Sequence, residues 1–338
     1  MDFTPTEEQE AARQLAAEVF GDLATPERLA AAGRDSDPEL WKALCAAGLV
    51  GAVEEVGLLG LVLLLEEQGR TTAQVPFAAS CVYGVLALAA HGSAEQRDRL
   101  LPGLRDGSVV VTGALFDGQV TEEGGRLSGV VPWVPWLRDA THVLVAAGAG
   151  LWLVRAADAA QEAVELTAPW AAGRLTLEGI PGERVGGAGA YEDVLATART
   201  AFAGVQAGVC AGSLARAVAY TNEREQFGKP LAAKQGVQLK AADAYMDTEA
   251  IRVTAYEAAW RRDSGLPYGT HALTAAWWAS EAGKRVVHAG QHLHGGMGAD
   301  VEHPVHRHFL WGRQLDAYLG CGSEVLEELG ESIVEESS

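Results

Sequence analysis

The spacing of apolar residues changes twice along the chain, and this change is the strongest constraint on its fold. Up to about residue 106, apolar side chains recur at the spacing that is typical of amphipathic helices. Between about residues 107 and 189, they form short runs that are typical of strands. Helical spacing then returns. The sequence therefore predicts a helical domain over residues 1–106, a small antiparallel β domain over 107–189 and a helical domain over 190–338.

Local signals agree with this division. Residues 37–39 combine an N-cap aspartate, a first-turn proline and a first-turn glutamate, which predicts a helix start. Gly48 and Gly51 are predicted to close that helix, and residues 56–65 predict a buried helix. The strand-like runs lie at 109–112, 130–131, 142–145, 151–154 and 174–177.

The composition excludes several classes of protein. Hydrophobic residues make up 48% of the 338 residues and charged residues only 21%, which excludes a disordered chain. The net charge of −19 disfavours binding to nucleic acid or to an anionic membrane surface. The apolar run at 56–65 is too short to span a bilayer, and the N-terminus lacks a signal-peptide pattern. Four cysteines without a CxxC pair predict neither disulfides nor a zinc ribbon, and fit a reducing cytoplasm.

Two glycine-containing segments are poor matches to nucleotide-binding loops. Gly228-Lys229-Pro230 has proline where a phosphate-binding loop needs serine or threonine for Mg²⁺, so a nucleoside triphosphatase is not supported. Gly148 and Gly150 follow a strand but lack the third glycine of a dinucleotide-binding fingerprint, so we predict a hairpin turn there.

Six of the nine histidines lie between residues 288 and 308. With Asp300 and Glu302 nearby, they raise the question of a metal site. They straddle a glycine-rich loop and Pro304, and no HExxH helix places two of them on one face. An ordinary surface or structural role is therefore the favoured interpretation, contact with a cofactor comes next, and a metal site is the least favoured.

Two further segments combine residues that suit a pyrophosphate and an adenine. In the first, Arg224, Gln226 and Phe227 follow a long predicted helix, and Gln235 comes shortly afterwards. In the second, His292 precedes Gly295 and Gly296, whose backbone amides can approach phosphate oxygens closely. An arginine beside a glycine turn is more often a plain helix C-cap, so both interpretations stay open on the chemistry alone.

These segments, together with the order helices, sheet, helices, resemble the acyl-CoA dehydrogenase family over nearly the whole chain. The resemblance implies N-terminal helices, a small β-barrel-like middle domain that holds a flavin ring, and a C-terminal four-helix bundle. It also implies that this chain contacts the ADP half of a neighbouring subunit's FAD. The implied contacts are Arg224, Gln226, Phe227, Gln235, His292, Gly295 and Gly296. His292 stands where the family usually has glutamine.

The residues that the family uses for chemistry differ here. The usual base is a glutamate in a Tyr-Glu-Gly-Thr-Ser-Glu type segment, and Gly320 takes its place. Some members place the base ahead of the long helix, just before an arginine, where this chain has Ala198. The family's Thr-Glu-Pro and Trp-x-Thr/Ser segments, which meet the flavin ring, correspond to Thr112-Gly113-Ala114 and Trp133-Val134-Pro135. No residue of this chain is therefore assigned as a base.

The resemblance implies a non-catalytic subunit of a heteromeric, α2β2, acyl-CoA dehydrogenase. A homologous partner would carry the glutamate and the flavin-ring pocket, and an electron-transfer flavoprotein would reoxidise the enzyme. The segments around His292 and residues 302–311 look most like partner subunits of actinobacterial steroid degradation, which makes a steroid-CoA thioester the leading substrate. The alternatives are a homomeric dehydrogenase with a relocated base (Asp316, Glu324 or Glu192), a flavin-free structural subunit, and metal binding by the histidines.

Overall fold

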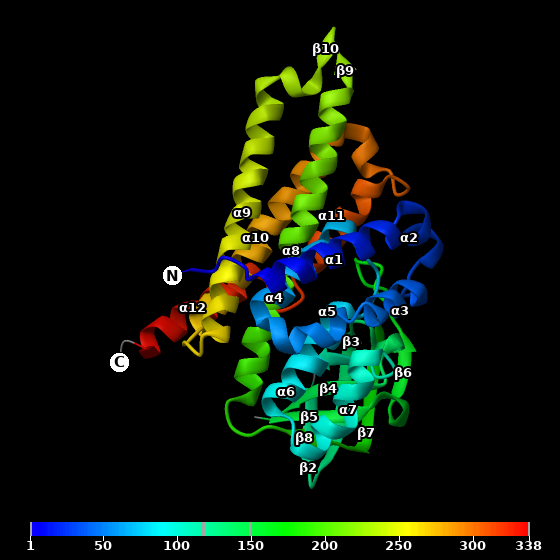
Figure 1. Ribbon diagram of the computed structural model, residues 1–338, viewed down its shortest axis with the longest axis vertical. Helices are drawn as coiled ribbons and strands as arrows, with labels where there is room; N and C mark the ends of the chain where they lie inside the picture. The colour runs from blue at the N-terminus through cyan, green and yellow to red at the C-terminus, as the bar shows by residue number, and fades with distance from the viewer. Residues whose placement is uncertain (1, 116–118, 149, 337–338) are drawn as a thin grey trace. The chain divides into compact units, whose positions relative to one another are not determined.

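The computed structural model describes residues 2–115, 119–148 and 150–336, in the order helices, strands, helices (Figure 1). This order confirms the predicted fold class. The chain divides into two compact units. One comprises Met1–Pro5, Val62–Ala73 and Arg199–Ser338, and the other Thr6–Leu61 and Gln74–Ala198. The boundaries of the three domains stay a prediction.

Helices form the chain before the first strand. Their bounds are α1 (Glu7–Leu23), α2 (Pro26–Ala32), α3 (Pro38–Ala46), α4 (Leu49–Thr71), α5 (Phe77–Ala79), the π-helix η1 (Ser80–Leu86), α6 (Ala87–His91) and α7 (Ala94–Asp106). The predicted helix start is confirmed, because the Asp37 carboxylate accepts the N–H groups of Glu39 and Leu40 at 3.0 and 3.1 Å. These bonds satisfy amides that the first turn of α3 leaves free.

The predicted buried helix at 56–65 is confirmed within α4, where its leucine and valine side chains are buried. Gly48 follows α3 with φ +74°, a left-handed conformation that suits a helix end. The prediction that Gly51 also closes a helix is wrong. α4 begins at Leu49 and includes Gly51, and its backbone departs from helical angles later, at Gly57.

The strands form two four-stranded sheets. Their bounds are β1 (Val111–Ala114), β2 (Gln119–Glu123), β3 (Arg126–Val134), β4 (His142–Ala147), β5 (Gly150–Arg155), β6 (Ala160–Ala163), β7 (Gly173–Pro181) and β8 (Glu183–Val185). One sheet has the order β1-β4-β5-β8 and the other β2-β3-β7-β6. β4 and β5 pair in antiparallel fashion with Ala147 opposite Gly150, as predicted for a hairpin, and Ala149 of that turn lies outside the described residues.

The prediction of a purely antiparallel β domain is wrong at one pair. β1 and β4 are parallel, with Val111 opposite His142, because the chain leaves the first sheet to form β2 and β3 before it returns. The two sheets share one core. It is formed by alternate residues of facing strands, such as Val143 and Val145 on β4 and Leu175 and Leu177 on β7.

The C-terminal part is helical. Its bounds are α8 (Ala190–Glu223), α9 (Gln235–Asp263), α10 (Gly269–His294), α11 (Pro304–Leu315) and α12 (Gly322–Glu336), with the short strands β9 (Glu225–Gln226) and β10 (Lys229–Pro230) between α8 and α9. Figure 1 shows the β9–β10 hairpin at the end where α8 passes into α9, with α9 and α10 running alongside each other.

Glycines allow α8 to approach the C-terminal half of α4 closely. Gly204, Gly208 and Gly212 recur every four residues on α8, and added Cβ atoms would meet the backbone carbonyls of Val62, Glu66 and Arg70 at 3.1, 2.0 and 2.4 Å. Side chains at these positions would therefore push the two helices apart. His308 of α11 also packs against Gly212, where an added Cβ would lie 2.5 Å from its Nε2.

α8 has the length and hydropathy of a membrane span, but 72% of its most apolar window is buried. Burial against other elements is also what the core helix of a folded domain shows.

Candidate functional site

The β9–β10 hairpin presents a strained and exposed aromatic ring. Gln226 pairs with Lys229, so Phe227 and Gly228 form a two-residue loop. Both have positive φ, +55° and +77°, as in a type I′ turn, where asparagine and glycine are the usual residues. Phe227 is 91% exposed, and the Lys234 ammonium lies 4.7 Å from its ring centroid. An aromatic residue held in this conformation suggests a role outside the fold of the single chain.

The polar residues predicted beside Phe227 are also exposed. Arg224 follows α8, and its backbone is fixed by two hydrogen bonds, to Tyr220 O at 2.8 Å and from Leu231 N at 2.9 Å. Its guanidinium makes no ion pair with any described residue. Gln235 is the first residue of α9 and is exposed. These side chains are therefore available to a ligand.

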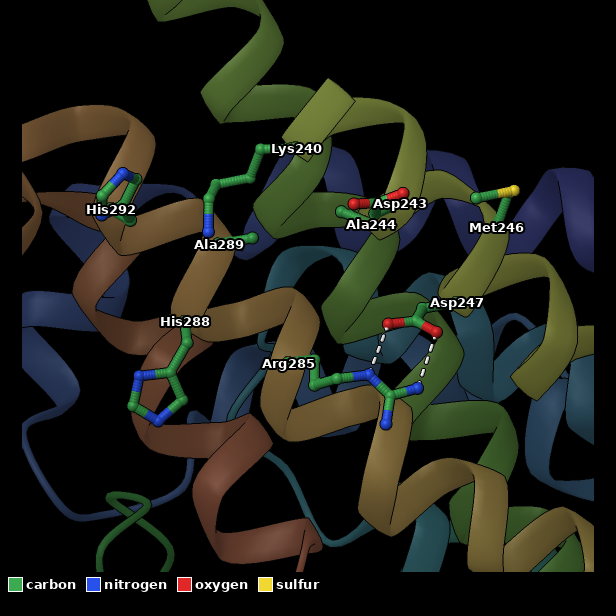
Figure 2. Close-up of a pocket in the computed structure, with 9 residues that line it drawn as sticks. All are labelled: Lys240, Asp243, Ala244, Met246, Asp247, Arg285, His288, Ala289 and His292. Carbon is green, nitrogen blue, oxygen red and sulfur yellow. Dashed lines mark hydrogen bonds and ion pairs between the residues drawn. The ribbon is translucent and has the colours of Figure 1, made fainter. Parts of the chain in front are cut away.

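A cleft of about 660 Å³ lies between α9 and α10 (Figure 2). It is lined by Lys240, Asp243, Ala244, Met246, Asp247, Arg285, His288, Ala289 and His292. At one end, Arg285 donates two hydrogen bonds to the Asp247 carboxylate at 2.7 and 2.8 Å. Of the predicted residues, the cleft includes His292. Lys240 and His288 were not predicted as ligand contacts.

The Arg285–Asp247 ion pair marks which turns of these antiparallel helices lie opposite each other. Lys240 lies seven residues before Asp247, and His292 lies seven residues after Arg285, so both lie two turns from the pair in the same direction. Continuing that way, α9 begins at Gln235 and α10 ends in the glycine loop. The structure thus brings Gln235, His292, Gly295 and Gly296 to one end of the helix pair. No hydrogen bond or ion pair joins them to the hairpin residues within the described chain.

The glycines of the loop after α10 differ in whether the fold requires a glycine at each position. Gly295 ends α10 with φ +62°, and Gly298 lies against Gln291, where an added Cβ would be 2.4 Å from a carbonyl oxygen. Gly296 has nothing within 4 Å of an added Cβ. The fold of this chain therefore gives no packing reason for Gly296, and the space over it is open to a ligand.

The clustered histidines divide into buried and exposed groups. His294 is buried, stacks on Tyr220 and lies 2.7 Å from Gly290 O, and the Nδ1 of His303 accepts the N–H of Val305 at the start of α11. His288 and His292 are exposed in the cleft. Over the described ranges, no three His, Cys, Asp or Glu side chains are arranged to hold a metal ion.

Gly320, which stands at the family's usual base position, is partly buried beside other side chains. Only about 20 Å³ of space remains there, beside Phe202 and Tyr318. An added Cβ on Gly320 would lie 3.0 Å from Val325 and 3.7 Å from the guanidinium of Arg199. That guanidinium is buried and donates to both carboxylate oxygens of Glu328 at 2.7 and 2.6 Å. The second base position, Ala198, lies inside α8 rather than ahead of it.

The alternative bases have other structural roles or lie in solvent. The Glu324 carboxylate accepts the N–H of Cys321 at 2.9 Å at the start of α12, and this hydrogen bond lowers the pKa of the carboxyl. Asp316 is buried and accepts the Ser280 hydroxyl at 2.6 Å. Glu192 is exposed in the first turn of α8. The geometry therefore favours none of them as a proton acceptor.

The two segments that correspond to the family's flavin-ring contacts lie against each other in this chain. The Thr112 hydroxyl donates to Pro135 O at 2.6 Å, and both groups belong to the same compact unit. The buried ring of Tyr83 covers Gly113, where an added Cβ would lie 2.6 Å from it. The Thr112 hydroxyl and the Gly113 backbone therefore already contact other groups of this chain.

Comparison with known proteins identifies the family. Models of the acyl-CoA dehydrogenase N-terminal and C-terminal domains match residues 6–108 and 186–332. The chain is 34% identical to acyl-CoA dehydrogenase FadE27 of Mycobacterium tuberculosis over 99% of each chain. It is similar to a chain of the Tcur3481-Tcur3483 steroid ACAD G363A variant (43% identity, TM-score 0.93, 98% and 99% covered). It is also similar to a chain of the ChsE4-ChsE5 complex from Mycobacterium tuberculosis (32% identity, TM-score 0.93, 99% of each covered). This chain belongs to the acyl-CoA dehydrogenase family.

Proposed function

We propose that this chain is the non-catalytic subunit of a heteromeric, α2β2, FAD-dependent acyl-CoA dehydrogenase. The enzyme introduces an α,β double bond into a CoA thioester. This chain contributes the contacts to the ADP half of the FAD, and a homologous partner carries the catalytic glutamate and the flavin-ring pocket. The chain alone is inactive.

One contrast carries this proposal: the base positions lack a carboxylate, whereas the residues proposed to contact the ADP half are in the sequence and exposed. A proton α to a thioester must be removed by a positioned base, and neither Gly320 nor Ala198 has an ionisable side chain. Of the alternative bases, Glu324 accepts the Cys321 N–H and Asp316 accepts the Ser280 hydroxyl within this chain. These hydrogen bonds count against a homomeric enzyme with a relocated base.

The exposed residues suit an ADP group. Family members are FAD-binding flavoproteins, and FAD supplies hydride acceptance at its ring. Arg224 can pair with a phosphate, and Phe227 offers a ring face to adenine. Gln226, Gln235 and His292 offer hydrogen bonds. Gly296 offers its backbone amide, whereas the Gly295 N–H donates to His292 O at the end of α10.

The similarity to a chain of the Tcur3481-Tcur3483 steroid ACAD supports a steroid-CoA substrate. Together with the similarity to a chain of the ChsE4-ChsE5 complex, it also supports a homologous partner. An electron-transfer flavoprotein is the proposed electron acceptor. We also propose a cytoplasmic site of action, in which Cys45, Cys81, Cys210 and Cys321, all free thiols, stay reduced.

The first experiment expresses the chain alone and together with a candidate homologous catalytic chain from the same organism. A colourless or insoluble product alone, and a yellow, active complex together, are expected. A yellow chain that oxidises an acyl-CoA on its own contradicts the proposal and favours the homomeric enzyme.

The second experiment changes Phe227 to asparagine in the complex. Asparagine is favoured in a type I′ turn, so the hairpin is kept while the ring is lost. Arg224→Gln removes the charge without touching the turn. Both variants should lower the flavin content at unchanged complex mass. Unchanged flavin content in both favours the alternative, a flavin-free structural subunit.

A further inference from the structure

Lysines are scarce in this chain and gather at the end of α9. Of five lysines in the whole sequence, Lys229, Lys234 and Lys240 lie within twelve residues. With Arg224 and the single acid Glu225, residues 224–240 carry four basic groups and one acidic group in a chain of net charge −19. The hairpin and the start of α9 therefore carry a local excess of positive charge, which is bounded by Glu223 on one side and by Asp243 and Asp247 on the other.

Lys240 is the lysine of this group that faces the cleft. Figure 2 shows its ammonium group directed toward α10, between the positions of His288 and His292. Unlike Lys284, whose ammonium lies 2.6 Å from Glu281, it has no ion pair in the described part of the chain. Asp243 lies one turn further along the same wall, and Asp247 is already paired with Arg285. The Lys240 charge is thus half-buried in a cleft without a protein counterion.

The size and position of the cleft fit part of a dinucleotide. Its volume of about 660 Å³ is in the range of small-molecule sites. It begins at His292, one turn before the open glycine Gly296. A phosphate that accepts the Gly296 amide, which lies one turn beyond His292, is therefore within a short reach of the helix face that carries Lys240. A flexible ammonium with three donors suits a phosphate approached from one side.

Resting on the proposed function, we propose that Lys240, with His292, binds the diphosphate of the ADP half of the flavin. Lys240 is a further cofactor-binding residue that lies outside the hairpin and the glycine loop. Acyl-CoA also contains an adenosine diphosphate group, so the experiment must distinguish the two sources of the same chemistry.

The test uses the purified heteromeric complex and measures its affinity for FAD at several KCl concentrations. Lys240→Met should weaken FAD binding about tenfold and make the affinity less dependent on salt, since one phosphate contact is lost. Lys240→Arg should retain most of the affinity. The matched control, Lys284→Met, removes a paired lysine from the neighbouring helix and should leave both quantities unchanged.

The outcomes separate this proposal from the proposed function. If Phe227→Asn loses flavin but Lys240→Met does not, the role of Lys240 is refuted and the shared site stands. If neither loses flavin, both fail. If Lys240→Met instead raises KM for the acyl-CoA at unchanged FAD affinity, the cleft belongs to CoA and the proposal is overturned.

Discussion

At the residue scale, His308 is a buried titratable group that the fold keeps neutral. Its Nδ1 lies 3.2 Å from Pro304 O and its Nε2 lies 3.0 Å from Arg70 O. A neutral imidazole has one N–H, so only one of these carbonyls can accept a hydrogen bond from it. Burial nevertheless lowers the pKa of His308 to about 4. Desolvation therefore outweighs the two carbonyls that would favour the charged ring.

This pKa predicts a loss of stability in mild acid. Above the unfolded pKa of about 6.5, both states are neutral and His308 has no effect. Below it, the unfolded chain binds a proton that the folded chain does not, so the free energy of unfolding falls by about 3 kcal/mol between pH 6.5 and 4. Urea unfolding of the complex at several pH values measures this. His308→Gln should flatten the dependence of the unfolding free energy on pH, whereas His288→Gln should not. Equal slopes in the unmodified protein and both variants would contradict the role given to His308.

Restoring a carboxylate at Gly320 should not restore a base. Gly320 has φ +101°, and Val325 lies 3.0 Å from an added Cβ. Gly320→Glu is therefore expected to destabilise the chain by about 1–3 kcal/mol and to leave it inactive alone. The control Gly330→Ala, in α12 with free space around an added Cβ, should be stabilising by about 1 kcal/mol. Thermal unfolding measures the change in stability, and an acyl-CoA assay measures the activity of the chain alone. An active Gly320→Glu chain would show that this chain has a complete catalytic site once a carboxylate is supplied.

At the scale of elements, the row Gly204, Gly208 and Gly212 on α8 is required by packing against α4, although helix propensity alone would favour alanine there. A Cβ on Gly208 would lie 2.0 Å from Glu66 O, and that oxygen belongs to the backbone of α4. Gly208→Ala is therefore expected to cost about 2 kcal/mol or more of unfolding free energy, although alanine is the better helix former. Gly236→Ala, in α9 with nothing within 4 Å, should instead stabilise. Chemical denaturation compares them; a stabilising Gly208→Ala would show that the helices can separate at little cost.

Elements were predictable from sequence where local chemistry specifies them. The cap at Asp37 and the apolar run of α4 depend on neighbouring residues, and both predictions are confirmed. The parallel pairing of β1 with β4 was missed because the apolar period reports which face is buried, not strand direction. The β9–β10 hairpin was missed because it carries phenylalanine where a turn signal would have asparagine. Lys240 was missed because its relation to His292 arises only from the register of α9 and α10.

At the scale of the whole molecule, α9 has an apolar row that the single chain leaves in water. Leu239, Met246 and Val253 recur every seven residues and are 57%, 60% and 47% exposed. Such a row favours helix packing in an assembly. Met246→Glu should therefore reduce the mass of the complex in solution, measured by light scattering. Val301→Glu, at a more exposed apolar residue outside α9, should leave the mass unchanged. Identical masses for both variants would exclude the α9 row from the interface.

The division of labour predicts the amount of flavin in the assembly. If this chain supplies only ADP contacts and its Thr112–Pro135 and Tyr83–Gly113 contacts persist, a ring pocket exists only on the partner chain. An α2β2 complex should then hold about one FAD per two chains, which absorbance and native mass measure together. Added FAD should not raise this ratio, because this chain lacks a ring pocket and a higher FAD concentration cannot supply one. A full complement of one FAD per chain would mean that the segments around Thr112 and Pro135 open in the complex, and that both subunits have complete flavin sites.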